Sequence, residues 1–199
     1  MFKQHGNIPI DVQKMDIDML SLSGHKIYAP KGVGALYVKK GIEFERFMDG
    51  GHQEKNKRSG TENVAEIVAL GKAAQISEKN IEQYQKKLKN LRDYCLEKIK
   101  KEIPNIHING TMEKRLPGNI NISFENSDSN ELLYKLDEYG ICASGGSACS
   151  SGDNNPSHVL TAIGVPSELA KGTIRFTFGD FNTKEDIDYL VEVLKKIRD

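Results

Sequence analysis

The tetrapeptide Ser23-Gly24-His25-Lys26 places a hydroxyl, an imidazole and an amine within four residues. The apolar run before it predicts a buried strand, and the Pro and two Gly after it predict a tight turn into a neighbouring strand. A lysine at the end of a buried strand tends to lose its proton, which makes it a nucleophilic amine able to form a Schiff base. Pyridoxal phosphate (PLP) is the usual aldehyde for such a lysine, and Ser23 and His25 are suitably placed to bind its phosphate. A solvated lysine in an ordinary turn explains the same residues, because a short motif is weak evidence by itself.

Cys149 lies in the middle of residues 144–155, a stretch dominated by Ser, Gly, Asn and Asp. This composition cannot form a core and predicts a mobile surface loop. An exposed thiol reacts to the degree that it ionises, and free cysteines are usually buried, so Cys149 is a candidate nucleophile rather than a tolerated surface residue. The other two cysteines are predicted to pack. Cys95 lies on an apolar stripe at helical spacing, formed by Ile81, Tyr84, Leu88, Leu91, Cys95 and Ile99. Cys142 alternates with apolar neighbours.

Two further stretches could bind anions. The segment Arg58-Ser59-Gly60-Thr61 opens a strongly helical run, with Thr61 as the predicted N-cap, and a helix N-terminus beside an arginine suits a phosphate. A solvated loop capped by Thr61 is the plainer interpretation. Arg175, on the polar side of a predicted strand, could bind a carboxylate through two hydrogen bonds, or form a surface salt bridge.

The elements that must position these residues form an α/β pattern. We expect the helical run 62–102 to bend or break near residues 77–80 because it is long for one globular helix. This break divides the chain into predicted domains 1–79 and 80–199. In the second domain the pattern predicts strands at 106–108, 120–124, 140–143 and 173–178, and helices at 130–136, 156–163 and 183–197.

Composition excludes several classes of function. The 199 residues carry 28 basic and 28 acidic side chains, and a formal net charge of zero argues against a nucleic-acid surface or a basic membrane anchor. No apolar run is long enough to span a bilayer, and residues 1–6 do not begin a signal peptide. Three cysteines without a C-x-x-C pair argue against a disulfide framework or a structural zinc site. The cytoplasm is the expected compartment.

Four motifs in order resemble a known family. The chain is similar to the C-terminal portion of a cysteine desulfurase of the NifS/IscS type, a class V aminotransferase-like enzyme of PLP fold-type I. This resemblance implies a remnant of the large-domain sheet in residues 1–79 and an α+β small domain with a mobile cysteine loop in residues 80–199. The motifs are the lysine segment 23–34, the segment 50–63 that reaches a neighbouring subunit, the strand segment 116–124 and the cysteine segment 146–160.

The resemblance implies a cofactor site for PLP. Lys26 would hold the cofactor as a Schiff base and shuttle a proton, and Ser23 and His25 would bind the phosphate. Thr61 would contact the phosphate bound by the other subunit of a homodimer or higher oligomer. The family pattern places an Asp and a Gln ahead of residue 6, whereas this chain has Lys3 at the Gln position and begins after the Asp position. We therefore expect an incomplete PLP pocket in this chain, which would be a truncated form lacking the N-terminal half.

The resemblance also implies the substrate chemistry. Arg175 would bind the α-carboxylate of L-cysteine, and Cys149 would take its sulfur as a persulfide, leaving L-alanine. The persulfide would pass to a sulfur acceptor, such as an iron–sulfur scaffold protein, for cluster assembly. No intrinsic metal site is expected, although Cys149 could be a transient iron–sulfur ligand.

Two alternatives stay open. A non-catalytic remnant could act as a dimerisation or partner-binding fragment, since most of the large-domain sheet is missing from the resemblance. A selenocysteine lyase would carry the same motifs. In each case an unpaired sheet edge and an uncovered apolar face predict that the free chain associates.

Overall fold

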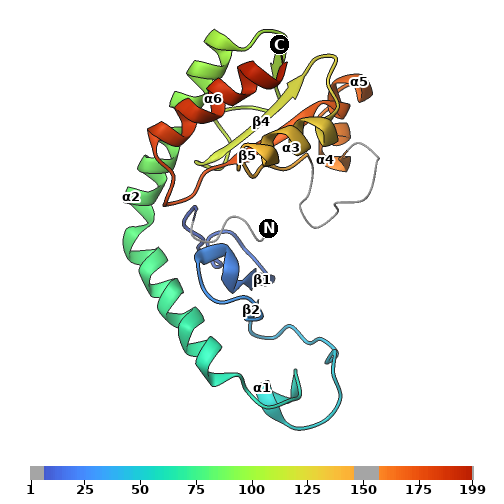
Figure 1. The fold of residues 1–199 in the computed structure, drawn as a ribbon. Coiled ribbons are helices and arrows are strands. Elements are labelled where there is room, and N and C mark those ends of the chain that lie inside the picture. The colour runs from blue at the N-terminus through green and yellow to red at the C-terminus, as the bar shows by residue number, and fades with distance from the viewer. Residues whose placement is uncertain (1–6, 146–156, 199) are drawn as a thin grey trace. The chain divides into compact units, whose positions relative to one another are not determined.

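The computed structural model describes residues 7–145 and 157–198 (Figure 1). The chain divides into two compact units, Met1–Gln83 and Tyr84–Asp199, which we call unit 1 and unit 2. The division falls inside the long helix α2 (Val64–Glu102), and each unit is described by itself. No helix of the described residues is long and apolar enough to cross a membrane.

Unit 1 is organised around an antiparallel pair of strands, β1 (Met19–Ser23) and β2 (Gly34–Val38). The pairing runs from Met19 opposite Val38 to Ser23 opposite Gly34, so the two predicted strands are neighbours as expected. Between them lies a short 3-10 helix, η1 (Gly24–Ile27). The Gly24 N–H donates to the Val33 carbonyl at 2.8 Å, which closes the connection at its base.

A polar loop leads from β2 to α2 and is closed by its own side chains. It contains the short helix α1 (Gln53–Asn56), in which positive φ angles interrupt the helical geometry. The Ser59 hydroxyl is buried and contacts the carbonyls of Met48 and Asp49 at 3.2 and 2.9 Å. These contacts close the part of the loop that contains α1.

Helix α2 is one helix of 39 residues, so the predicted break at residues 77–80 is wrong. No Gly or Pro occurs between Lys72 and Glu102, and a Ser or Asn inside a helix costs only a few tenths of a kcal/mol. The prediction that Thr61 caps this helix is also wrong. Helix α2 begins at Val64, and it is Asn63 Oδ1 that accepts from the Glu66 N–H, at 3.5 Å.

Unit 2 contains a three-stranded antiparallel sheet in the order β3-β4-β5. Its strands are β3 (Ile106–Ile108), β4 (Asn119–Phe124) and β5 (Thr173–Thr177). Its helices besides the second half of α2 are α3 (Ser129–Glu138), α4 (His158–Ala162), α5 (Ser167–Lys171) and α6 (Lys184–Arg198).

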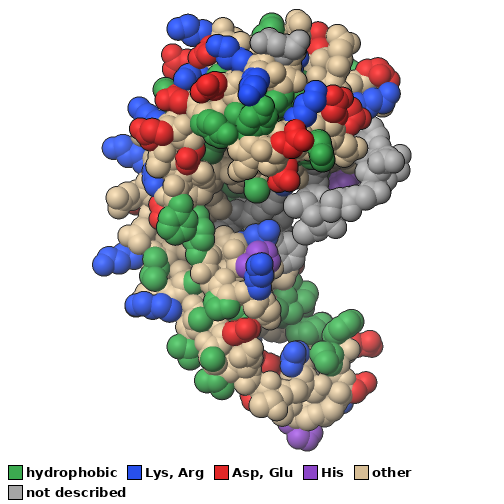
Figure 2. All heavy atoms as spheres, viewed as in Figure 1, with side chains coloured by type: hydrophobic (Ala, Val, Ile, Leu, Met, Phe, Trp, Pro, Cys, Tyr) green, Lys and Arg blue, Asp and Glu red, His purple; other side chains and the backbone are tan. Residues whose placement is uncertain are grey.

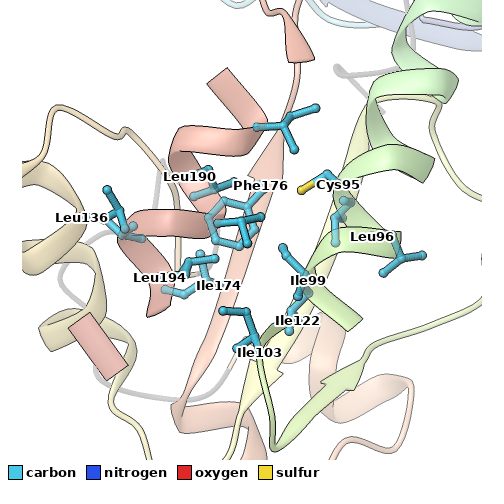
Figure 3. Close-up of a cluster of buried hydrophobic side chains, with 14 of the residues drawn as sticks. Cys95, Leu96, Ile99, Ile103, Ile122, Leu136, Ile174, Phe176, Leu190 and Leu194 are labelled. Atoms are coloured by element: carbon cyan, nitrogen blue, oxygen red, sulfur yellow. The ribbon is translucent and has the colours of Figure 1, made fainter. Parts of the chain in front are cut away.

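One face of this sheet carries the core of the unit. Side chains of β4 and β5 meet those of α2, α3 and α6, and Figure 3 shows them converging between the sheet and the helices. The apolar stripe predicted on the second half of α2 is confirmed, because Leu88, Leu91, Cys95 and Ile99 are all buried. Fully buried members include Cys95, Ile99, Ile120, Ile122, Phe124, Leu136, Ile174, Ile187 and Leu194.

Two predictions in unit 2 need correction. Residues 140–143 form no strand, and the pairing there is a single bridge between Ser144 and Arg175. Helix α4 begins at His158, with Ser157 as its cap, and not at Pro156. The predicted helix 183–197 is α6, and Thr183 caps it, because the Thr183 hydroxyl accepts from the Asp186 N–H.

Candidate functional site

The residues of the first candidate site share one turn of unit 1. Ser23 ends β1, and His25 and Lys26 follow on η1. The turn ends at Tyr28, which has a left-handed backbone with φ 64°. A Cβ at Gly24 would lie 2.9 Å from the Val33 carbonyl oxygen and 3.1 Å from the Ala29 Cβ. Glycine is therefore needed where this turn packs closely against Val33 and Ala29.

The environment of Lys26 differs from the prediction. We expected the amine at the end of a buried strand, but both Lys26 and His25 are exposed, whereas Ser23 is half-buried. Burial of Lys26, which was the premise for a neutral nucleophile, is thus not supplied by the described residues of this chain.

Thr61 lies on a separate segment of unit 1. It is exposed and lies three residues before the first residue of α2, so it belongs to the loop and not to the helix end. Nearby, Arg58 Nη1 donates to the Ser59 carbonyl at 2.7 Å, and the Gly60 N–H donates to Gln53 Oε1 at 3.1 Å. One nitrogen of the Arg58 guanidinium thus helps to close the loop, while Thr61 remains accessible.

Arg175 lies in the middle of β5, in unit 2. It is opposite Asn121 on β4, and its backbone N–H and C=O bond to Ser144 at 2.7 and 3.2 Å. Arg175 is half-buried, and its place in the strand puts it on the face of the sheet opposite the apolar core. Arg175 is therefore held by backbone hydrogen bonds to Ser144 on one flank and lies beside β4 on the other.

Cys149 lies outside the described residues, as does most of the predicted loop 144–155. The described residues on either side of it belong to unit 2. Gly145 packs near Ser129 of α3, where an added Cβ would lie 3.1 Å from the hydroxyl oxygen. On the other side, the Ser157 hydroxyl accepts from the Val159 N–H at 3.3 Å at the start of α4.

The two other cysteines differ from each other. Cys95 is fully buried, as predicted, and burial raises the pKa of its thiol to about 12. Cys142 is exposed, so its predicted packing role is wrong. The residues on either side of it, Ile141 and Ala143, pack against the core, whereas Cys142 is exposed.

Sequence reasoning missed a polar network on the second face of the unit 2 sheet. Asn109 Nδ2 donates to Asn121 Oδ1 and to Ser123 Oγ, both at 2.8 Å. Ser123 Oγ lies 2.7 Å from Thr173 Oγ1, which donates to the Leu169 carbonyl at 3.2 Å. Its signal in the sequence is the alternation of polar and apolar residues along 119–123, which predicted a strand but not buried partners.

The described residues thus fall into two groups. Ser23, His25, Lys26 and Thr61 belong to unit 1, and Arg175 belongs to unit 2. Among the described residues, no three His, Cys, Asp or Glu side chains are arranged to hold a metal ion.

Comparison with known proteins assigns the class of this fold and site. The family model for aminotransferase class-V matches residues 2–190, and the chain belongs to this family. Its relatives include proteins named cysteine desulfurase IscS from Dictyoglomus turgidum, 48% identical over 192 residues, and from Clostridium botulinum, 49% identical over 194 residues. Each alignment covers 96% of this chain and 49% of the relative. The predicted family resemblance is confirmed, and the chain spans about half the length of these curated relatives.

Solved structures agree with this assignment. A NifS-like protein from Rickettsia africae superposes with a TM-score of 0.88 and 35% identity, over 98% of this chain and 51% of that chain. A structure described as SspA in complex with cysteine superposes with a TM-score of 0.64 and 32% identity, over 92% of this chain and 50% of that chain. The expected fold class, a partial α/β fold of the fold-type I enzymes, is therefore confirmed.

Proposed function

We propose that this chain supplies the lysine- and cysteine-bearing half of a PLP-dependent cysteine desulfurase. The observation that carries the proposal is the grouping of Ser23, His25 and Lys26 on one sterically fixed turn, in a chain 48% identical to a protein named cysteine desulfurase. The net reaction converts L-cysteine and the Cys149 thiol into L-alanine and a Cys149 persulfide.

The turn at η1 fits PLP in the chemistry of its donors. The Ser23 hydroxyl and the His25 imidazole suit a phosphate, and the Lys26 amine, next along the same turn, suits an aldehyde. Thr61 would add a hydroxyl to the phosphate bound by a second subunit. When bound, PLP supplies an electron-withdrawing ring that stabilises negative charge on the substrate carbon.

The remaining roles fall to residues of unit 2. Arg175 orients the substrate by binding its α-carboxylate through a bidentate pair of hydrogen bonds. The Cys149 thiolate attacks the substrate sulfur, a sulfur–sulfur bond forms, and the carbon–sulfur bond breaks. Lys26 Nζ delivers the proton that completes alanine. The persulfide then passes to a sulfur acceptor, for which an iron–sulfur scaffold protein is the candidate.

The exposed surface of unit 1 supports a requirement for the other half of the fold. Among its described residues only Leu20, Ile27 and Ala29 are buried apolar side chains. Figure 2 shows apolar side chains on the surface of this unit. Ten large ones are exposed there: Met15, Met19, Tyr28, Leu36, Phe47, Met48, Val64, Ile67, Val68 and Ile76. The upstream half of a class-V fold would cover this surface and desolvate Lys26, either as a preceding segment or as a separate chain.

The test combines the 199-residue chain with the upstream half of a class-V relative and adds PLP. We expect borohydride reduction to label Lys26, and L-cysteine to be converted into L-alanine. Cys149→Ala should abolish turnover and keep the label, whereas Cys142→Ala should keep both. Absence of label and turnover in the combined protein would overturn the proposal.

The alternative functions give different results in the same experiment. A non-catalytic remnant would form a stable dimer that releases no sulfide from L-cysteine under reducing conditions. A selenocysteine lyase would turn over L-selenocysteine with a far larger kcat/KM than L-cysteine. The uncovered apolar surface of unit 1 is the observation that favours the non-catalytic remnant as an alternative.

A further inference from the structure

The polar network in unit 2 has a fixed direction. The Leu169 carbonyl can only accept, so the Thr173 hydroxyl donates to it. The Ser123 hydroxyl must then donate to Thr173 Oγ1, which leaves Ser123 Oγ to accept from Asn109 Nδ2. The second Asn109 Nδ2 hydrogen is donated to Asn121 Oδ1 at 2.8 Å.

This direction determines how the Asn121 amide is turned. Its oxygen accepts from Asn109, on the β3 side, so the Nδ2 group with its two hydrogens is the part left to face other partners. Asn109 is only 6% exposed, and Ser123 and Thr173 are fully buried. Turning the amide over would place two donors against each other inside a buried network, which is costly.

The strand register brings Asn121 next to Arg175. The backbone N–H and C=O of Arg175 bond to Ser144, so they point away from β4. Asn121 and Arg175 are therefore a non-hydrogen-bonded pair, the type in which facing side chains approach most closely. Their Cβ atoms are expected to be about 5 Å apart, on the polar face of the sheet.

We propose that Asn121 binds the substrate α-carboxylate together with Arg175, through an amide oriented by the hydrogen-bond chain that starts at the Leu169 carbonyl. The inference rests on the proposed function, in which Arg175 receives this carboxylate. The ligand class is an α-amino acid, whose carboxylate has enough lone pairs to accept from a guanidinium and an amide together.

The decisive variant is Asn121→Asp. It keeps an oxygen to accept from Asn109 but replaces the amide donors with a second, negatively charged oxygen. Asn119→Asp is the matched control. Asn119 lies on the same face of the same strand but opposite Thr177, and its Oδ1 accepts from Arg115 Nη1 at 3.2 Å.

A first measurement uses the 199-residue chain and needs no activity. NMR titration of the carboxyl introduced by Asn121→Asp should give a pKa at least about one unit below the ordinary value, because a guanidinium within about 6 Å favours the ionised form. Adding Arg175→Gln should remove most of this lowering. The same addition should leave the carboxyl introduced by Asn119→Asp unchanged. A carboxyl at position 121 that does not respond to Arg175→Gln would overturn the inference.

A second measurement uses the combined enzyme. Asn121→Asp should raise KM for L-cysteine by about tenfold or more and change kcat little, whereas Asn119→Asp should change KM less than about threefold. An unchanged KM in Asn121→Asp beside a raised KM in Arg175→Gln would overturn the role of Asn121 alone. An unchanged KM in both variants would overturn the carboxylate assignment of the proposed function as well.

Discussion

At the scale of single residues, the two described cysteines differ in burial, and burial decides whether a reagent can reach the thiol. Cys95 is fully buried, and burial raises the pKa of its thiol to about 12, so the unreactive thiol form predominates at pH 8. Cys142 is exposed. Among the described residues, Cys142 is therefore the one cysteine whose thiol is accessible for reaction, and Cys95 is a core side chain.

This difference predicts the outcome of thiol labelling. In the Cys149→Ser variant, we expect an alkylating reagent to modify Cys142 at least about 100-fold faster than Cys95, since the thiolate is the reacting species. Mass spectrometry of the two peptides measures both rates, and denaturant should make them similar. Labelling of Cys95 in the folded chain at a rate near that of Cys142 would contradict the buried assignment.

Much at this scale could be predicted from the sequence, and the failures have physical causes. The burial of Cys95 follows from its place on an apolar stripe repeated every three to four residues, because that period depends only on helix geometry. The exposure of Lys26 could not be predicted, because it depends on which residues lie over the turn in space. The network of Asn109, Ser123 and Thr173 joins residues far apart in sequence, so the local alternation along 119–123 predicts a strand but not which side chains it contacts.

At the scale of elements, α2 and α6 are joined by a charged contact at Asp188. Its Oδ1 accepts from Lys98 Nζ at 2.6 Å and from the Tyr94 hydroxyl at 2.7 Å. The Lys98 and Tyr94 hydrogen bonds hold the pKa of Asp188 below its ordinary value. The contact therefore contributes stability above the unfolded-state pKa, and this contribution is lost as the pH falls through the lower, folded-state pKa.

Replacement of this carboxylate should show the same pH dependence. Asp188→Asn should lower the urea midpoint of unfolding at pH 7, and the difference from the wild-type chain should shrink below about pH 4, as first the unfolded and then the folded state becomes protonated. Glu97→Gln, an exposed change on α2, is the control and should have little effect at either pH. A midpoint difference that is the same at pH 7 and pH 3 would show that Asp188 acts by something other than its charge.

The elements also show which boundaries a sequence pattern can supply. The strands of unit 2 were predicted nearly in full because alternation of polar and apolar residues is a local signal. The helix formers of the long helix were recognised from composition, but its continuity through residues 77–80 was not predicted. Ser77 and Asn80 are weak helix formers, but they do not end a helix without Gly, Pro or a cap.

At the scale of the whole molecule, the two units differ in how well they are packed. Unit 2 has a contiguous core of strands and helices, whereas unit 1 has two paired strands and three buried apolar residues among those described. A two-stranded pairing without a packed face is at best marginally stable in water.

Hydrogen exchange should reveal this difference. We expect backbone amides of β1 and β2 to exchange at least about 100-fold faster than those of β4 and β5, because local opening needs little free energy where little apolar surface is buried. Adding the upstream half of the fold should slow exchange in β1 and β2 and leave β4 and β5 unchanged. Equal protection of both units in the free chain would contradict the inference that the apolar surface of unit 1 is uncovered.

The apolar side chains on unit 1 also affect the lifetime of the polypeptide in a cell. Proteases and chaperones act on opened and apolar segments, so the abundance of a protein follows the population of its covered state. A chain whose unit 1 stays uncovered is a substrate for this quality control, and one that is covered escapes it. The steady-state level of the chain would therefore report how much of it has found the rest of a class-V fold, without any assay of sulfur chemistry.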